Sequence, residues 1–360
     1  MTRAERADVV IVGAGLLGLS AAYALRGRRD VIVLERATVG HARGGSHGPS
    51  RIFRFGYPDR VYVTMARRAL DGWRRLEQES GAQLLEMTGQ LSFGPGADDV
   101  FDALTTAGAP VYRLPANEVA ERAPNFAGHG PAVFEPESGV LAAADVLDAL
   151  RSTVACEVRE HVWVRSVGDG EDGVRVETND GTVTARTAIV AAGPWTTGLV
   201  PSMHTFATLE HVAYVRARES PAPRLPVFID HRIPAVYGLP TPRSDLYKIA
   251  LHHDGAVVDP EADDLGPVPG AVEALEAATR DWLPAFEPQA VEIDTCLYDN
   301  TRDEDFIVDR VGNVVIGAGT SGHGFKFGPV LGELLAALAD GSEPPIDITR
   351  FRRDRTRLVR

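Results

Sequence analysis

The feature that most restricts how this chain can fold is a glycine-rich turn between an apolar strand and a helix near the N-terminus. Residues 8–12 form a short β-branched run, and GAGLLG (13–18) follows at once and leads into the alanine-rich stretch LSAAYALRG. A second apolar run, residues 31–34, ends at Glu35. These segments predict one complete β-α-β unit at the start of the chain, and therefore an α/β fold with a parallel sheet.

The spacing of the three glycines suits a pyrophosphate group. Gly13 permits the tight turn, Gly15 lets the pyrophosphate approach backbone N–H groups at the positive helix end, and Gly18 allows close packing of helix on strand. Glu35 could accept hydrogen bonds from the ribose hydroxyls of an adenosine, and an acid there disfavours a 2′-phosphate. This pattern does not separate NAD from FAD. The alternative is a chance glycine turn with a solvated Glu35.

The rest of the chain divides into segments of two kinds. A helix is expected at about 62–80, a strand in GQLSFG, a helix near 142–151 and a hairpin that turns through Asn179-Asp180-Gly181 into the apolar run TAIVAAG. Between about 205 and 288 prolines cluster and apolar runs are short, which indicates strands and loops of a second domain. From Val314 an apolar strand, the bend SGHGFKFG and a helix follow.

The two ends of the chain therefore resemble each other, and the middle does not. We expect a nucleotide-binding domain assembled from 1–85, 140–204 and 290–360. A β-rich substrate domain is expected from 86–139 and 205–289. The basic end TRFRRDRTRLVR is interpreted as a solvated tail.

Charge and cysteine content exclude several classes of protein. The 360 residues carry 37 basic and 50 acidic side chains, and a net charge of −13 repels phosphate backbones and anionic lipids, so neither nucleic acid nor membrane is an expected partner. The two cysteines, Cys156 and Cys296, offer neither a disulfide framework nor a CxxC cluster, and no metal site is expected. The first apolar run is too short for a signal segment, and the prediction is a cytoplasmic protein.

Four further motifs carry a family resemblance: GSHGPSRIFRFGY (45–57), the run 237–240, CLYDNTRDEDFIVD (296–309) and SGHGFKF (321–327). In order and spacing they resemble the monomeric sarcosine oxidase and N-methyltryptophan oxidase family, and the similarity extends over nearly the whole chain. The resemblance implies a Rossmann-like FAD-binding domain with a β-rich substrate domain, a monomer, and FAD as cofactor.

The same resemblance assigns FAD contacts to several segments. The glycine-ended strands AIVAAGPW and NVVIGAGTSGHGFKFG look like flavin-side elements, and the loop before the arginine pair is one residue shorter than is usual in the family. Cys296 falls where the family attaches FAD through a thioether; the alternative is a buried structural cysteine. The FAD contacts implied beyond the first β-α-β unit are Ser46, His47, Ser50, Gly193, Cys296, Gly322, Gly324 and Lys326.

Catalytic and substrate residues follow from the resemblance too. Lys326 is expected over the flavin, where a cation promotes reduction of oxygen; the alternative is a buried stem with its ammonium in water. Arg51 and Arg54 match the family's arginine pair, and three residues apart on a helical turn they would share one side, Arg51 near the flavin and Arg54 at the substrate carboxylate. A surface basic pair is the alternative.

A strand is expected to carry the remaining site residues. Lys248 and His252 are four apart and would share one strand face, Lys248 as a carboxylate ligand and His252 as an active-site histidine. Tyr237 is expected at the substrate, and Tyr298 shares the face of Cys296. TPRSDLY replaces the glycine-rich stretch of sarcosine oxidases and puts bulk near the substrate entrance.

The reaction implied is oxidation of a secondary or N-methyl amino acid, with transfer of a hydride equivalent to flavin, hydrolysis of the imine and reoxidation by O2 to give hydrogen peroxide. Two alternatives stay open. One is a flavin dehydrogenase of the same fold that acts on a cyclic amino acid such as pipecolate, or on another amino acid, and passes its electrons to an acceptor other than oxygen. The other is a nucleotide-binding module without activity, which would have no use for Cys296, Lys326 and the arginine pair together.

Overall fold

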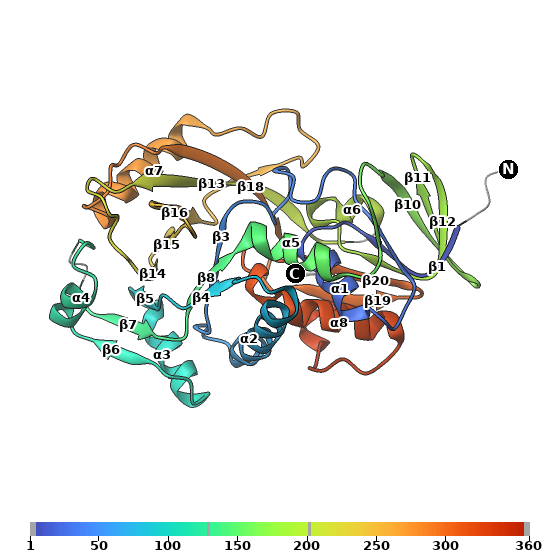
Figure 1. The fold of residues 1–360 in the computed structure, drawn as a ribbon, viewed down its shortest axis with the longest axis horizontal. Coiled ribbons are helices and arrows are strands. Elements are labelled where there is room, and N and C mark those ends of the chain that lie inside the picture. Colours follow the sequence, from blue (N-terminus) through green and yellow to red (C-terminus); the bar gives the residue numbers. More distant parts are fainter. Residues whose placement is uncertain (1–4, 128–129, 201–202, 356–360) are drawn as a thin grey trace.

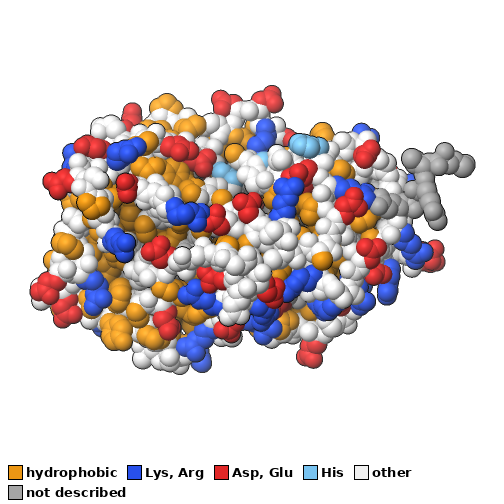
Figure 2. All heavy atoms as spheres, viewed as in Figure 1, with side chains coloured by type: hydrophobic (Ala, Val, Ile, Leu, Met, Phe, Trp, Pro, Cys, Tyr) orange, Lys and Arg blue, Asp and Glu red, His pale blue; other side chains and the backbone are white. Residues whose placement is uncertain are grey.

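Two large sheets dominate the computed structural model, which describes residues 5–127, 130–200 and 203–355 (Figure 1). The first sheet, with α1 and α8, lies toward the end of the molecule that carries the N-terminus, and the second sheet, with α7, lies at the opposite end. Charged side chains of both signs are mixed over the face shown in Figure 2, so the excess of acidic residues forms no single large patch there.

The first sheet has eight strands within the described residues, in the order β10-β11-β12-β1-β2-β9, with β20 beside β12 and β19 beside β20. Its strands are β1 (Glu5–Val12), β2 (Val31–Leu34), β9 (Glu157–Arg159), β10 (Val164–Gly170), β11 (Gly173–Thr178), β12 (Gly181–Val190), β19 (Ile307–Val311) and β20 (Val314–Ala318). β1 pairs in parallel with β2 and β12. Val9 and Ile11 face one apolar core and Val10 and Val12 face another, which explains why this strand is apolar at every position.

Four helices of the described residues lie beside the first sheet, and the most extensive contact among them is between α1 and α8. They are α1 (Leu16–Leu25), α2 (Arg60–Ser80), α5 (Ala143–Thr153) and α8 (Gly328–Asp340). The longest, α2, begins where the Asp59 side chain accepts a hydrogen bond from the N–H of Val61 and ends at Gly81, whose φ of 74° is left-handed. The helices expected at about 62–80, near 142–151 and after the SGHGFKFG bend are therefore confirmed.

The second sheet has nine strands in the described chain, in the order β17-β13-β16-β15-β14-β5-β7-β6, with β18 beside β13. Its strands are β5 (Gln90–Phe93), β6 (Tyr112–Leu114), β7 (Ala132–Glu135), β13 (Phe206–Arg216), β14 (Val227–Asp230), β15 (Ala235–Pro240), β16 (Leu246–His252), β17 (Ala256–Val258) and β18 (Glu292–Asn300). The expected division put residues 292–300 with the first domain, whereas β18 pairs with β13 over nine residue pairs in the second sheet. The domain boundaries themselves stay a prediction.

The middle of the chain also contains a helix that the sequence analysis missed. α7 (Pro269–Trp282) begins with a proline in its first turn, and its buried residues, Leu275 and Trp282 among them, pack into the core of the second sheet. Trp282 stacks on Phe228 with ring centroids 4.8 Å apart. The cluster of prolines concealed this helix because Pro269 marks a helix start as well as a loop.

Shorter elements complete the fold. They are the small sheet of β3 (Ser50–Phe53), β8 (Gly139–Ala142) and β4 (Leu85–Glu86), the helices α3 (Gly96–Thr106), α4 (Ala116–Arg122) and α6 (Thr196–Leu199), and the 3-10 turns η1 (Gly193–Trp195), η2 (Phe325–Phe327) and η3 (Thr349–Phe351). In the part of the chain that the structure describes, no helix has the length and apolar composition needed to cross a membrane.

One expectation about the chain end is wrong. The C-terminal basic segment is not a freely solvated tail up to residue 355, because Arg350, Arg352 and Arg355 form ion pairs with Asp305, Asp309 and Asp303. The last five residues of that segment lie outside the described residues. The expected α/β class, with a Rossmann-like sheet assembled from separate chain segments and a second β-rich sheet, is confirmed.

Candidate active site

A cavity of about 740 Å³ is lined by residues of both sheets. Such a volume is typical of sites for small molecules and cofactors. It brings together every predicted site residue except Gly18: Gly13, Gly15, Glu35, Ser46, His47, Ser50, Arg51, Arg54, Gly193, Tyr237, Lys248, His252, Cys296, Tyr298, Gly322, Gly324 and Lys326.

The first glycine turn forms one end of this cavity. Gly13 has a φ of +98°, and a Cβ there would lie 2.5 Å from the carbonyl oxygen of Ala191. A Cβ on Gly18 would lie 1.8 Å from the carbonyl oxygen of Gly13, so Gly18 lets α1 pack directly on the turn and has no place in the cavity wall. The Leu16 N–H donates to Ser46 Oγ at 3.1 Å, which ties the start of α1 to the loop of Ser46.

The Glu35 side chain is buried and held by hydrogen bonds, and it is not solvated. Its carboxylate accepts hydrogen bonds from the N–H groups of Ala14 (2.8 Å) and Ala37 (2.9 Å). Burial opposes its ionisation, but hydrogen bonds from His41 and from these two N–H groups outweigh burial and lower the pKa of Glu35. Glu35 is therefore an anion that holds the glycine turn beside the cavity.

A first pair of cations lies near Cys296. The Arg51 guanidinium donates to the carbonyl oxygens of Ser50 (2.9 Å), Gly45 (3.0 Å) and His47 (2.6 Å), so the backbone fixes its position. Burial, and then the charge of Arg51, lower the pKa of Lys248 to about 7. Burial raises the pKa of the Cys296 thiol, while the charges of Arg51 and Lys248 act in the opposite direction.

A second pair of cations lies in another part of the cavity. Lys326 Nζ donates to the Tyr57 hydroxyl at 2.9 Å and to the carbonyl oxygen of His323 at 2.7 Å. Burial, and then the charge of Arg54, lower the pKa of Lys326 well below its ordinary value. The Arg54 guanidinium lies 4.4 Å from the centre of the Tyr57 ring.

The arginine pair adopts a backbone that differs from the expectation. Residues 50–53 form the strand β3 and not a helical turn, because they pair with residues 139–142 of β8. Arg54 follows the end of that strand, and both arginines still line the cavity. The charge of Arg51 acts on Lys248, whereas the charge of Arg54 acts on Lys326. This grouping differs from the prediction, which placed Lys248 at the substrate carboxylate and Lys326 over the flavin.

The strand β16 carries Lys248 and His252 on one face, as their spacing predicts, and both line the cavity. His252 Nδ1 lies 3.5 Å from the Tyr298 hydroxyl, and its ring meets that of Tyr237 edge to face at 6.2 Å between centroids. Burial, and then the charges of His253 and His323, lower the pKa of His252 well below its ordinary value, so this imidazole is neutral at neutral pH.

The polar lining of the cavity fits the FAD that the resemblance implies. Ser50 Oγ is buried without a hydrogen-bond partner among the described residues, and it belongs to the wall. A Cβ added at Gly193 would meet no atom within 4 Å, which leaves open space on that side of η1. His47 is held in the wall by Asp294, 3.2 Å from its Nε2.

Two glycines near Lys326 leave room for neighbouring side chains because they have no Cβ. A Cβ on Gly322 would lie 2.0 Å from the Tyr298 ring, and one on Gly324 would lie 2.6 Å from Thr320 Cβ. The bend that carries Lys326 therefore approaches Tyr298 of β18 closely because Gly322 has no Cβ, and Gly324 allows the tight turn of the bend itself.

Sequence reasoning assigned no role to Tyr57 or His323, although both lie within the quoted motifs. The Tyr57 hydroxyl lies 3.1 Å from His323 Nδ1 and 2.9 Å from Lys326 Nζ, so the two residues connect the second cation pair to the chain around it. An aromatic residue at the end of 45–57 and a histidine between glycines were the available signals, but only the fold shows that they meet.

Comparison with known proteins agrees with this geometry. The chain matches the model of the DAO family, "FAD dependent oxidoreductase", over residues 8–338. It is 34% identical to peroxisomal sarcosine oxidase of Homo sapiens, over 96% of this chain and 95% of that one. It is 30% identical to N-methyl-L-tryptophan oxidase of Yersinia pestis (strain Pestoides F), over 96% of this chain and 98% of that one.

Solved structures share the fold. NikD, an unusual amino acid oxidase essential for nikkomycin biosynthesis, superposes with a TM-score of 0.87 at 24% identity and 97% and 98% coverage. The L-proline dehydrogenase of P. horikoshii superposes with a TM-score of 0.85 at 18% identity and 97% coverage of both chains. The fold is thus common to an oxidase and a dehydrogenase. From its family match, together with the sarcosine oxidase and N-methyltryptophan oxidase relatives, this chain belongs to the family of FAD-dependent oxidoreductases.

Proposed function

We propose that this protein is an FAD-dependent oxidase of secondary or N-methyl amino acids that releases an imine, which then hydrolyses, and hydrogen peroxide. The observation that carries the proposal is the second cation pair, Arg54 and Lys326, in the same cavity as Cys296. One pair suits a substrate carboxylate, and the other lies beside the cysteine at which the resemblance attaches the flavin.

FAD, when bound, supplies the redox chemistry by accepting a hydride equivalent from the amine and passing two electrons to O2. The glycine turn with Gly13, Gly15 and Glu35 would hold its nucleotide part, and Ser46, His47 and Ser50 the part nearer to Arg51. The remaining contacts would come from Gly193, Gly322, Gly324 and Cys296.

Arg54 and Lys326 are proposed to bind the substrate carboxylate. Neither forms an ion pair within 4.0 Å among residues 5–127, 130–200 and 203–355, although both line the cavity. Two cations placed together out of water repel each other, and a bound carboxylate relieves that repulsion. Carboxylate capture at this point fixes the position of the amine and of the carbon to be oxidised.

The same cations prepare the amine. Their field is one of the influences that lower the pKa of His252. It also lowers the pKa of a substrate ammonium held nearby, so the amine binds more readily in the neutral form that can be oxidised. The neutral His252 can accept a hydrogen bond from the amine N–H, and Tyr298 and Tyr237 hold the imidazole ring.

The first cation pair is proposed to serve the reaction with oxygen. Lys248 and Arg51 both affect the titration of Cys296, so they lie close to the point of attachment that we propose for the flavin. Positive charge there stabilises the negative charge that develops as O2 accepts an electron. This proposal exchanges the tasks that the sequence analysis gave to Lys248 and Lys326.

We propose that Cys296 holds FAD covalently through its sulfur. Its side chain lines the cavity, and two nearby cations favour the thiolate that such a bond requires. We also propose a monomeric protein of the cytoplasm, a compartment in which Cys156 and Cys296 can stay free thiols until the flavin binds.

A peroxide assay over a panel of amines tests the proposed function. The panel contains sarcosine, N-methylated amino acids, cyclic imino acids, D-amino acids and, as a control, N-methyl amines without a carboxylate. We expect peroxide from at least one secondary amino acid and none from the amines that lack a carboxylate. Reduction of a dye acceptor without peroxide would instead indicate a dehydrogenase, and no turnover at all would contradict the proposal.

A further inference from the structure

We infer that the C-terminal arginines Arg350 and Arg355 are positioning residues for Lys326, to which they connect through the loop 301–306 and the side chains of His323 and Tyr57. The inference deepens the proposed function, because it rests on the assignment of Lys326 to the substrate carboxylate. Neither the two arginines nor the groups that connect them to Lys326 carry out chemistry; they determine where the Lys326 ammonium lies.

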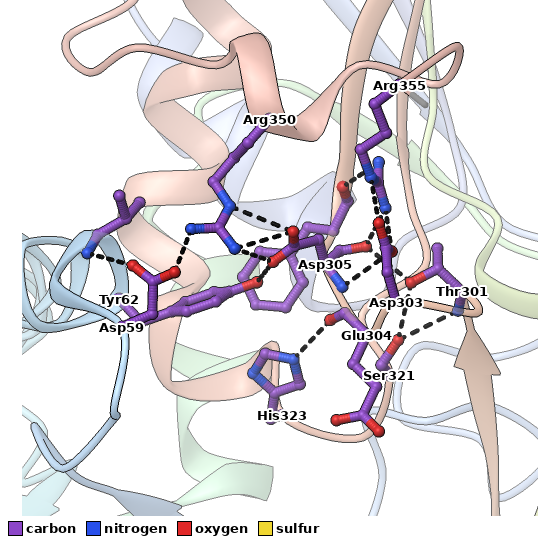
Figure 3. Close-up of polar contacts among 12 residues, drawn as sticks. Asp59, Tyr62, Thr301, Asp303, Glu304, Asp305, Ser321, His323, Arg350 and Arg355 are labelled. Atoms are coloured by element: carbon purple, nitrogen blue, oxygen red, sulfur yellow. Dashed lines mark hydrogen bonds and ion pairs between the residues drawn. The ribbon is translucent and has the colours of Figure 1, made fainter. Parts of the chain in front are cut away.

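Arg355 fastens one side of the loop between β18 and β19 (Figure 3). Its guanidinium forms two parallel hydrogen bonds with the Asp303 carboxylate, at 2.8 and 2.7 Å, and donates further to the carbonyl oxygens of Asp305 (2.7 Å) and Phe306 (3.0 Å). The Arg355 side chain is only 7% exposed and that of Asp303 only 11%. A bidentate pair this far from water is a fixed connection, unlike a surface ion pair.

Arg350 fastens the other side of the loop. Figure 3 shows its guanidinium between Asp305 of the loop and Asp59, the capping residue just before α2. It donates to both carboxylate oxygens of Asp305, at 2.8 and 2.9 Å, and Asp305 also accepts a hydrogen bond from the Tyr62 hydroxyl at 2.8 Å. The loop is thereby joined to the C-terminal segment and to α2 at once.

Between these two fastened acids lies a strained residue. Glu304 has a φ of 60°, in the left-handed region that residues with a Cβ seldom adopt. Such a conformation persists only where its neighbours determine it. Its effect is to turn the Glu304 carbonyl oxygen toward His323 Nε2, which lies 2.9 Å away and is drawn facing it in Figure 3.

That contact sets the direction of the hydrogen bonds beyond it. A carbonyl oxygen only accepts, so His323 carries its proton on Nε2, and its Nδ1 accepts from the Tyr57 hydroxyl at 3.1 Å. The Tyr57 oxygen is then free to accept from Lys326 Nζ at 2.9 Å. If His323 carried its proton on Nδ1 instead, its N–H and the Lys326 ammonium would both have to donate to the Tyr57 oxygen, and Nε2 would have no proton to donate to the Glu304 carbonyl oxygen.

A second connection holds the same two segments together. The Thr301 N–H donates to Ser321 Oγ at 3.2 Å, and Thr301 Oγ1 donates to the carbonyl oxygen of Asp305 at 2.8 Å. Ser321 is a buried residue with a φ of 46°, at the start of the bend that carries His323 and Lys326. The loop therefore supports the bend at two points, and the arginines support the loop.

The test compares Arg355→Met and Arg355→Lys with the matched control Arg352→Met. Arg352 belongs to the same segment but pairs with Asp309 of β19, outside the loop. The flavin spectrum of the holoenzyme is titrated with acetate, a carboxylate without an amine, and the protonated nitrogen of His323 is read from ¹⁵N-histidine spectra assigned with His323→Gln. Tyr57→Phe cuts the connection downstream of the loop.

We expect Arg355→Met and Tyr57→Phe each to raise the dissociation constant for acetate and the KM for the amine about tenfold, with a smaller change in kcat, because each misplaces one charged donor. Arg355→Lys should restore part of the affinity, and Arg352→Met should leave it unchanged. Arg355→Met should also remove the signal of a proton fixed on His323 Nε2. Unchanged acetate affinity and an unchanged histidine spectrum in Arg355→Met would overturn the inference.

Two further results keep the test decisive. If Arg355→Met does not fold, Asp303→Asn, which keeps the shape of the pair and removes its charge, should raise the acetate dissociation constant severalfold; wild-type affinity in that variant would overturn the inference. If no amine in the panel is oxidised, the proposed function fails, while the acetate titration and the histidine spectrum still decide whether the arginines position Lys326.

Discussion

Lys248 and Lys326 are the same residue type and are equally buried, at 5% exposure each, yet their neighbours differ, and we propose different tasks for them. Lys248 shares its surroundings with Arg51 and Cys296, and Lys326 shares its surroundings with Arg54 and Tyr57. A buried lysine therefore predicts that a negative charge will lie nearby, and only its neighbours indicate whether that charge is a substrate carboxylate or the charge that develops during the reaction.

The buried carboxyl group of Asp299 provides a test of how burial changes the pKa of a single residue and, through it, the stability of the protein. Burial raises its pKa to about 6, although the Gly319 N–H donates to its Oδ2 at 2.6 Å. An unfolded aspartate has a pKa of about 3.9, so above that pH the unfolded chain releases a proton that the folded chain keeps. The cost to stability grows as the pH rises toward about 6 and is constant above it.

We therefore expect Asp299→Asn to stabilise the protein more at about pH 7.5 than at about pH 4.5, with a full effect of about 2 to 3 kcal/mol. Melting temperatures of variant and wild type at the two pH values measure the difference. Asp263→Asn, which removes an exposed carboxylate, is the control. An equal gain at both pH values would show that burial does not raise the pKa of Asp299.

At the level of elements, the sequence predicts local structure well where one pattern decides it. The β-α-β unit, the hairpin through Asn179-Asp180-Gly181 and the shared face of Lys248 and His252 all follow from periodicity or turn chemistry. The strand β3 could not be recognised in this way, because four residues pair with β8 from far along the chain. The helix α7 was missed for a different reason, because its first-turn Pro269 follows a cluster of prolines that also indicates loops.

Two helical glycines test the packing of the first turn. Gly18→Ala in α1 would place a Cβ 1.8 Å from the Gly13 carbonyl oxygen, whereas Gly270→Ala in α7 would meet no atom within 4 Å. We expect Gly18→Ala to destabilise the protein by about 1 to 3 kcal/mol and to lower the fraction of chains that incorporate FAD. Gly270→Ala should be neutral or stabilising by less than about 1 kcal/mol. Equal melting temperatures for the two variants would contradict the close contact between α1 and the turn.

At the scale of the whole molecule, the sequence predicts two sheets built from alternating segments but not how they share a cavity. Arg54 and Lys326 come from positions more than half the chain apart, and they share the cavity because the fold places β3 next to η2. The C-terminal arginines show the same limit: their charge suggested solvent, and their partners at 303–309 became visible only in the fold.

The proposed covalent bond joins the cofactor to the second sheet through Cys296 of β18. In acid-denatured wild-type protein we expect the yellow colour to stay with the polypeptide, and the mass to exceed that of the chain by one FAD less two hydrogen atoms, because the thioether replaces an S–H and a C–H bond. Cys296→Ala should release its flavin into the supernatant under the same conditions, while Cys156→Ala should behave like wild type. Release of flavin from the wild-type protein would refute the bond without affecting the rest of the site.

The division of labour between the two cation pairs is tested most directly by stopped-flow measurement of both half-reactions in Lys248→Met and Lys326→Met. We predict that Lys326→Met raises the substrate concentration needed for anaerobic flavin reduction at least about tenfold and leaves reoxidation by O2 near the wild-type rate. Lys248→Met should slow reoxidation by about a hundredfold and spare reduction, because it removes the charge beside the electron acceptor. The reverse pattern, or equal effects of both variants on both half-reactions, would contradict the account.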